Sequence, residues 1–87
     1  LSLTKVLAAE WGAAGIRVNA ICPGLIRTDF SAALWSNETL VRQMLALQAI
    51  PRVGEGDDVA GLALFLASDA SRYCTAGGFT VDGGYTA

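Results

Sequence analysis

The sequence predicts an α/β fold with a parallel sheet, and three observations lead to this class. Three segments of the chain repeat their apolar residues with the period of a helix. Two short apolar runs have the length and composition of strands. The order along the chain is helix, strand, helix, helix, strand, and strands separated by helices pair in parallel through crossover connections.

The first element is a helix over residues 1–11. Its apolar positions recur on one face, at Leu3, Leu7 and Trp11. Gly12 and Gly15 follow, and either one suits the left-handed conformation that ends many helices. A short connection then leads into the next element, as in other αβ units.

The stretch IRVNAICPGLIRTDF, residues 16–30, is the one around which the rest of the chain is arranged. Residues 16–22 are mostly apolar, which predicts a strand covered on both faces, with Arg17 and Asn19 as its polar positions. A polar side chain in such a strand needs partners, so we expect Asn19 to hydrogen-bond neighbouring backbone groups.

Pro23 and Gly24 are expected to end this strand. Proline has no N–H to donate, and glycine admits the close approach of another backbone or of a ligand. Ligands of open α/β sheets bind just beyond the carboxyl ends of the strands. The turn is therefore a candidate ligand site. The alternative is an ordinary turn that only ends the strand, because Pro-Gly is common in such turns.

Residues 31–49 predict a second helical zone that Ser36 or Asn37 caps. Leu34 and Trp35 stand just before this helix, and large apolar residues continue along it. Such residues after a ligand turn fit either a flap over an apolar ligand or ordinary helix packing. The apolar residues of the helix itself are Leu40, Val41, Met44, Leu45 and Leu47.

Residues 51–58 form a turn-rich segment, and Asp57 and Asp58 open a third helix that closes at residues 68–72. Acids at that end interact favourably with the helix dipole, which explains them without a metal cluster. A turn-rich link over residues 73–78 leads to a short strand at residues 79–81, and Asp-Gly-Gly ends it.

The composition excludes several classes of function. Six basic and eight acidic residues are scattered singly, for a net charge of -2, so nucleic acid and membranes are not expected partners. No apolar run reaches the roughly 18 residues that span a bilayer. The chain has no His for acid–base or metal chemistry. Cys22 and Cys74 lack CxxC spacing, so we expect reduced thiols in a cytosol-like compartment.

The size and apolar content predict an exposed apolar face. The chain is 53% hydrophobic and 16% charged, whereas a chain of this length buries only about 60–65% of its surface when it folds alone. We expect a partner, or another part of the protein, to cover the excess. The chain starts at Leu1 inside a helical pattern, from which we expect a fragment whose N-terminal part is absent.

Four motifs, in this order, resemble the C-terminal third of a classical short-chain dehydrogenase/reductase. They are LTKVLAAEWGAAGIRVN at 3–19, NAICPGLIRT at 19–28, IPRVGEGDDVAGLALFLASDAS at 50–71 and VDGG at 81–84. Together they extend along essentially the whole chain. The resemblance implies that residues 1–87 are the C-terminal portion of a single-domain, Rossmann-like, doubly wound parallel sheet, with a substrate loop at residues 29–50.

The resemblance also implies hydride transfer between NAD or NADP and a carbonyl or alcohol. It places Pro23 and Gly24 beside the nicotinamide ring. The Ile26 backbone would contact the carboxamide, and the Thr28 hydroxyl would bind the carboxamide or a phosphate. The expected cofactor-binding residues are thus Pro23, Gly24, Ile26 and Thr28.

Leu34, Trp35 and Met44 would belong to the substrate lid, which hints at an apolar ketone or alcohol. The glycine-rich phosphate loop and the Tyr-x-x-x-Lys pair of the family are not among these 87 residues, because neither Tyr73 nor Tyr85 has a Lys four positions later. We therefore assign this chain no catalytic residue and no metal ligand.

The expected role is to supply the nicotinamide-flanking turn, the lid and subunit contacts of a cytoplasmic homo-oligomeric enzyme. The alternative is a non-catalytic oligomerisation module of the same origin. The chain departs from the family pattern at Ala76, where a Gly is common, and this leaves the turn before the last strand in doubt.

Overall fold

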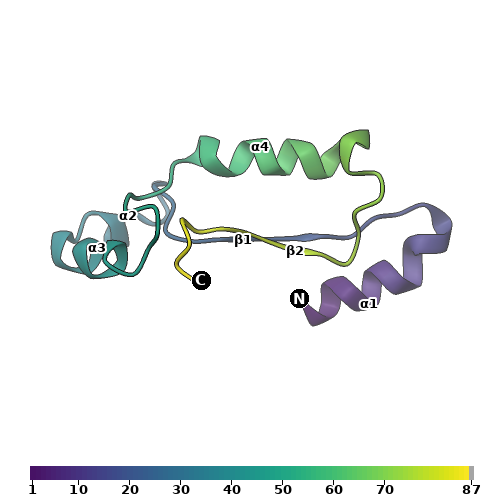
Figure 1. The fold of residues 1–87 in the computed structure, drawn as a ribbon, viewed down its shortest axis with the longest axis horizontal. Helices are drawn as coiled ribbons and strands as arrows, with labels where there is room; N and C mark the ends of the chain where they lie inside the picture. Colours follow the sequence, from purple (N-terminus) through teal and green to yellow (C-terminus); the bar gives the residue numbers. More distant parts are fainter. Residues whose placement is uncertain (87) are drawn as a thin grey trace.

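The structure, a computed structural model, describes residues 1–86. These residues form two strands, four α-helices and two short 3₁₀ segments, and Figure 1 shows how the strands and α-helices are arranged. In chain order they are α1 Ser2–Trp11, η1 Gly12–Ala14, β1 Ala20–Pro23, α2 Ala32–Trp35, α3 Glu38–Leu45, α4 Gly56–Ala67, η2 Asp69–Ser71 and β2 Gly78–Val81. The strands pair in parallel, with Ala20 opposite Gly78 and Pro23 opposite Val81, which confirms the predicted α/β class.

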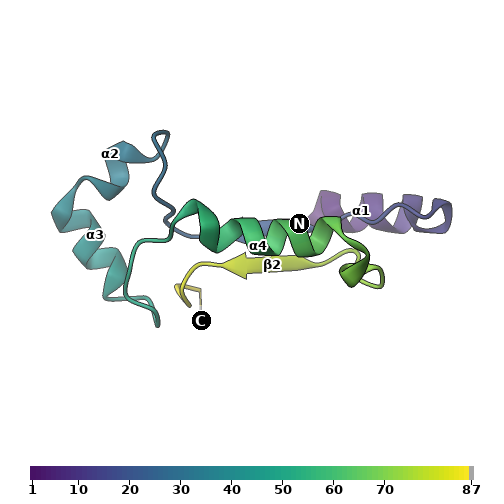
Figure 2. The same cartoon turned by 90° about the horizontal axis from the view of Figure 1, so that it is seen from above.

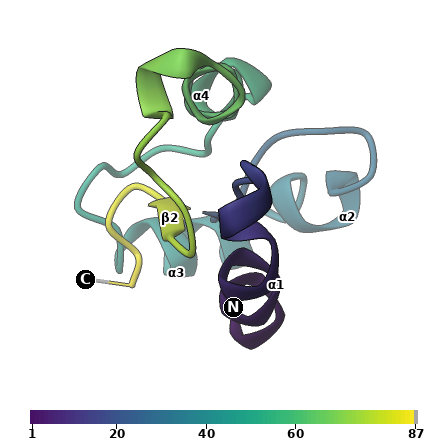
Figure 3. The ribbon, with the colours of Figure 1, turned by 90° about the vertical axis from the view of Figure 1, so that its right-hand side faces the viewer.

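Helices cover the strand pair on two sides. Seen end-on, α4 lies on one side of the strands and α1 on the other (Figure 3). Seen from above, α4 runs along the pair (Figure 2). The α2–α3 hairpin lies beyond the carboxyl ends of both strands, the end at which ligands bind in such sheets (Figure 1). The described chain measures 48 × 23 × 22 Å along its principal axes.

The first helix is followed by a glycine in the left-handed conformation that ends many helices. Gly12 keeps a right-handed conformation and opens the short η1 segment, whereas Gly15 has φ 82°. Of the two glycines that the sequence offered, Gly15 therefore supplies the left-handed residue. Ala8, in the middle of α1, is 4% exposed.

The predicted start of the first strand is wrong, because β1 begins at Ala20 rather than at residue 16. The segment opposite residues 16–19 is a loop, so a regular ladder cannot form there. The Val18 N–H instead donates to the Thr75 hydroxyl at 3.1 Å, and the Val18 carbonyl accepts from Ala76 N at 2.8 Å. Nor is the strand covered on both faces: its residues are half-buried or exposed, and Ile16 before it is 48% exposed.

Asn19 has the role that was predicted. Its side-chain amide donates to the Cys74 carbonyl at 3.0 Å and accepts from Gly77 N at 3.1 Å. Ala76, between those two residues, has φ 61° and is the one residue other than glycine with a positive φ in the described chain. The glycine that the family commonly places here would adopt this conformation without steric cost.

The second helical zone is two helices rather than one. Asn37 caps α3, since its side chain accepts a hydrogen bond from Leu40 N at 3.1 Å. The Ser36 hydroxyl instead donates to the Ala32 carbonyl within α2. Leu34 and Trp35 therefore lie in a helix of their own, and α3 ends at Leu45, four residues before the predicted end.

Arg17 ties the C-terminal end of α4 to the start of the sheet. Its guanidinium donates to the carbonyls of Leu66 at 3.0 Å and Ser68 at 3.2 Å, and to the Ser71 hydroxyl at 2.9 Å. A fourth bond reaches the Cys74 carbonyl at 3.3 Å. A cation suits this position because helix C-termini carry unpaired carbonyls and partial negative charge.

Much apolar surface of the described residues remains exposed, as the composition predicted. The exposed area is 6100 Å², whereas a compact monomer of this mass exposes about 4,900 Å². The radius of gyration is 15.3 Å, against about 12 Å for a compact domain of this length. Large exposed residues occur on both helices that cover the strands: Leu3, Val6, Leu64 and Phe65. No described helix is long and apolar enough to cross a bilayer.

Candidate functional site

The turn that ends β1 is packed against the end of β2. Gly24 N donates to the Val81 carbonyl at 2.9 Å, which continues the ladder one step past Pro23. A Cβ on Gly24 would lie 2.8 Å from the Cβ and 2.9 Å from the Cα of Asp82. Glycine is therefore required here by the close approach of a neighbouring backbone.

A second tie holds the turn to the segment before α4. Gly54 N donates to the Leu25 carbonyl at 2.9 Å, and Arg27 N donates to the Gly54 carbonyl at 2.7 Å. These two bonds form an isolated parallel bridge between Ile26 and Gly54. The Ile26 N–H donates to no acceptor within residues 1–86.

The Thr28 hydroxyl lies on the same turn and is exposed. It lies 3.1 Å from the Ser31 hydroxyl and accepts from Ser31 N at 3.2 Å. Ser31 Oγ in turn donates to the Ile26 carbonyl and accepts from Thr28 N at 3.1 Å. Thr28 and Ser31 thus close a small polar loop directly after the bridge.

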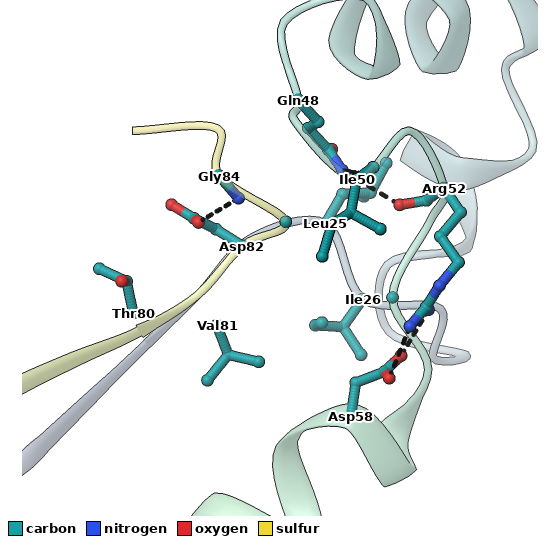
Figure 4. Close-up of a pocket in the computed structure, with 12 residues that line it drawn as sticks. Leu25, Ile26, Gln48, Ile50, Arg52, Asp58, Thr80, Val81, Asp82 and Gly84 are labelled. Atoms are coloured by element: carbon teal, nitrogen blue, oxygen red, sulfur yellow. Dashed lines mark hydrogen bonds and ion pairs between the residues drawn. The ribbon is translucent and has the colours of Figure 1, made fainter. Parts of the chain in front are cut away.

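A cavity of about 380 Å³ opens beside this turn (Figure 4). Leu25 and Ile26 form one wall, the segment that precedes α4 forms another, and residues 80–84 at the end of β2 form a third. Of the four predicted cofactor-binding residues, only Ile26 lines it. Pro23, Gly24 and Thr28 lie on the same turn but outside this cavity.

Two of the three charged groups that line the cavity, Arg52 and Asp58, are paired with each other. Arg52 makes a bidentate contact with Asp58, at 2.7 Å and 2.9 Å (Figure 4). This hydrogen-bonded pair holds the pKa of the Asp58 carboxyl well below its usual range and raises the pKa of Arg52. Asp58 also accepts from Glu55 N at 2.7 Å, which satisfies an N–H at the start of α4.

Asp82, at the other side of the cavity, accepts hydrogen bonds from residues of the turn that follows it. Its carboxylate accepts from the Thr86 hydroxyl at 2.8 Å and from Gly84 N at 2.9 Å. The Thr86 hydrogen bond and the neighbouring backbone N–H groups lower the pKa of Asp82. Both acids therefore stay ionised near neutral pH and cannot donate a proton there.

The predicted lid residues do not line this cavity. Leu34 is 48% exposed, and Met44 is half-buried in α3. Trp35 lines a separate, shallow hollow of about 500 Å³ with Glu38, Val41, Arg42 and Leu45. Its indole N–H donates to the Thr28 carbonyl at 2.8 Å. Of the three lid residues, Trp35 is thus the one that the structure brings to the turn.

Several residues of this region were not singled out from the sequence. Arg52 and Asp82 were treated as parts of turns, and Asp58 was given only a helix-dipole role. The spacing of Glu55 and Asp58, three positions apart before an apolar run, is a signal that could have identified the helix start. The pairing of Arg52 with Asp58 has no comparable sequence signal.

Known proteins resemble this chain in sequence. The family model described as Enoyl-(Acyl carrier protein) reductase matches residues 1–86. The human protein Dehydrogenase/reductase SDR family member 4 is 43% identical over 84 residues, which are 97% of this chain and 30% of that protein. The chain spans about one third of the length of the curated relatives that it matches.

Solved structures of dehydrogenases are similar to this chain in fold and in sequence. A 4-hydroxyisoleucine dehydrogenase complexed with NADH has a TM-score of 0.92 and 38% identity, over 98% of this chain and 35% of that one. A provisionally assigned 2-deoxy-D-gluconate 3-dehydrogenase from Agrobacterium tumefaciens, with bound NADP, has a TM-score of 0.93 and 42% identity, over 98% and 35%. From the family model and these relatives, the chain belongs to the short-chain dehydrogenase/reductase family.

Proposed function

We propose that this chain is the C-terminal third of an NAD(P)-dependent oxidoreductase that transfers a hydride between a nicotinamide cofactor and a carbonyl or alcohol. The observation that carries the proposal is the turn after β1. It lies at the common carboxyl end of two parallel strands and presents a backbone N–H without a partner, that of Ile26, two residues before an exposed hydroxyl. The NADH and NADP complexes among the similar structures support the choice of cofactor.

The residues of the turn fit a nicotinamide. The ring is flat and its carboxamide has both a donor and an acceptor. Pro23 and Gly24 would border the ring, because neither has a long side chain. The free N–H of Ile26 would donate to the carboxamide oxygen, and Thr28 Oγ would bind the carboxamide or a phosphate once it turns away from Ser31.

The cofactor, when bound, supplies or accepts the hydride. This chain would orient it and shield it from water, and the groups that move a proton would come from elsewhere in the protein. Residues 29–50, with Leu34, Trp35 and Met44, would cover the substrate, and an apolar ketone or alcohol is the class that these side chains favour. We place the complete protein in the cytoplasm, as a homo-oligomer.

Titration of the complete protein with NADH and NADPH tests the proposal. We expect one of the two to bind, and we expect Thr28→Val to weaken it about ten-fold, since a lost hydrogen bond of this kind costs about 1–1.5 kcal/mol. Thr39→Val is the matched control, because Thr39 is an exposed threonine on α3 away from the turn. Binding of neither nucleotide would refute the proposal.

A non-catalytic oligomerisation module is the second candidate. The exposed apolar residues of α1 and α4 favour it: Leu3 is 67%, Val6 59% and Leu64 72% exposed. Under this reading the complete protein forms an oligomer but binds no nucleotide. Sedimentation of the complete protein and of its Leu64→Ser variant, alongside the titration, separates the two candidates.

A further inference from the structure

We propose that Arg27 is a positioning residue of this site, which sets through Trp35 where helix α2 lies relative to the turn that carries Ile26 and Thr28. The proposal rests on the proposed function, because it gives α2 the role of a lid. It adds a residue to which neither the resemblance nor the comparisons give a role.

The backbone of Arg27 is held in place by a hydrogen bond to another segment of the chain. Its N–H donates to the Gly54 carbonyl at 2.7 Å, in the bridge that joins the turn to the segment before α4. The side chain therefore starts from a backbone position that is hydrogen-bonded to a second segment of the chain.

The side chain makes two contacts from that point. The guanidinium carbon lies 5.2 Å from the centroid of the Trp35 ring, within the range of a cation–π interaction. Nη1 lies 3.6 Å from a carboxylate oxygen of Glu55, the residue that caps α4. Arg27 thus stands between the lid helix and the start of α4.

Trp35 is held from two directions. The Arg27 cation lies over the ring, and the indole N–H at the ring edge donates to the Thr28 carbonyl at 2.8 Å. Two consecutive residues of the turn therefore hold one side chain of α2. Any shift of this turn on binding a cofactor would move α2 with it.

Each contact is weak alone, because the Arg27 and Glu55 side chains are 50% and 53% exposed. Contacts of this kind shift a local equilibrium by about two- to five-fold each. Only the Trp35 contact joins Arg27 to the lid helix, whereas the Glu55 contact steadies the guanidinium from the side of α4. Loss of Arg27 therefore corresponds to about a two- to five-fold shift between a docked and a released lid.

The test uses the complete protein and the variants Arg27→Ala, Arg27→Lys and Arg72→Ala. Arg72 is the matched control: it is an exposed arginine beyond the opposite end of α4, where its Nη1 bonds only the Asp69 carbonyl of its own turn. Two measurements are made. One is amide hydrogen exchange over residues 29–45 without ligand. The other is steady-state kinetics, which give KM and kcat for an apolar ketone or alcohol at saturating cofactor.

We expect Arg27→Ala to speed exchange over residues 31–36 about two- to five-fold, and to raise KM by a similar factor with kcat nearly unchanged. Arg27→Lys should recover part of both effects, because it keeps a cation near the ring. Unchanged exchange in Arg27→Ala, or the same change in Arg72→Ala, would overturn the proposal. The NADH and NADPH titration judges the proposed function separately, since exchange over residues 29–45 requires neither cofactor nor turnover.

Discussion

The backbone of Gly24 packs directly against Asp82. A Cβ on Gly24 would lie 2.9 Å from the Cα of Asp82. The contact joins the turn that follows β1 to the residue that follows β2. It fixes the common end of the two strands, where the candidate site lies.

Gly24→Ala should therefore disturb both stability and the site. The added methyl would meet backbone as well as side chain, and neither can yield without moving a strand end. We expect a loss of about 1–3 kcal/mol in the free energy of unfolding, with weaker nucleotide binding. Urea unfolding and the NADH titration measure the two effects. Gly56→Ala is the control, because a Cβ there has nothing within 4 Å; equal behaviour of the two variants would contradict the steric explanation.

Ala76→Gly should stabilise the protein. Ala76 has φ 61°, a conformation that costs an L-residue about 1–2 kcal/mol, whereas glycine in an unfolded chain costs about 0.5–1 kcal/mol in added entropy. We expect a net gain of about 0.5–1 kcal/mol, read from thermal unfolding. Ala60→Gly, in the right-handed interior of α4, should lose about 1 kcal/mol. A loss in both variants would mean that φ at residue 76 is not positive.

Arg17→Ala should cost about 2–4 kcal/mol, because it leaves the carbonyls at the end of α4 without their charged donor. Arg17→Lys keeps the charge but cannot reach three carbonyls and a hydroxyl at once, so we expect roughly half that loss. Chemical unfolding of the three proteins gives the comparison. A change below about 0.5 kcal/mol for Arg17→Ala would show that water replaces these bonds at no cost.

The pairing of Asp58 with Arg52 predicts a dependence of stability on pH. Folding lowers the pKa of Asp58, so its contribution is complete above the unfolded pKa of about 3.9 and is lost as the pH falls further. We expect the melting temperature to fall below about pH 4, and to fall less in Asp58→Asn.

Melting curves between pH 7 and pH 2 measure this effect. Asp82, whose pKa is also lowered, should leave part of the slope in place. Asp57→Asn is the control, because the Asp57 side chain makes no hydrogen bond or ion pair within the described chain. If Asp58→Asn and the parent lose stability in parallel, the ion pair does not persist in solution.

Local signals in the sequence were sufficient for much of this fold. The helix over residues 1–11, a cap at Ser36 or Asn37 and the last strand follow from residues close together in the chain. Asn19 was also assigned correctly, because an amide in an apolar run has few other uses. The late start of β1 was missed because it depends on the irregular loop at residues 74–77, which lies opposite it only after folding.

The same limit applies to the candidate site. The Pro-Gly turn was found because its residue types restrict the backbone directly. The contacts of Arg17 with α4 lie about 50 positions away in the chain, and no local pattern indicates them. Arg27 lies within one of the four motifs, but no role could be assigned to it from the sequence, because its partners Trp35 and Glu55 come from two later segments.

The distance along the chain between the two strands also has a consequence for folding. Asn19 and Gly77, which lie just before the first pair of the ladder, are 58 positions apart, and closing a loop of that length costs about 3.6 kcal/mol in chain entropy before any rung of the ladder forms. Contacts of such long range slow folding, so α1 and α4, whose hydrogen bonds are local, should form before the strands meet. Until then β1 and β2 each present unpaired edges that can add to a strand of another chain. The interval between helix formation and strand closure is therefore when a newly made molecule is most prone to aggregate.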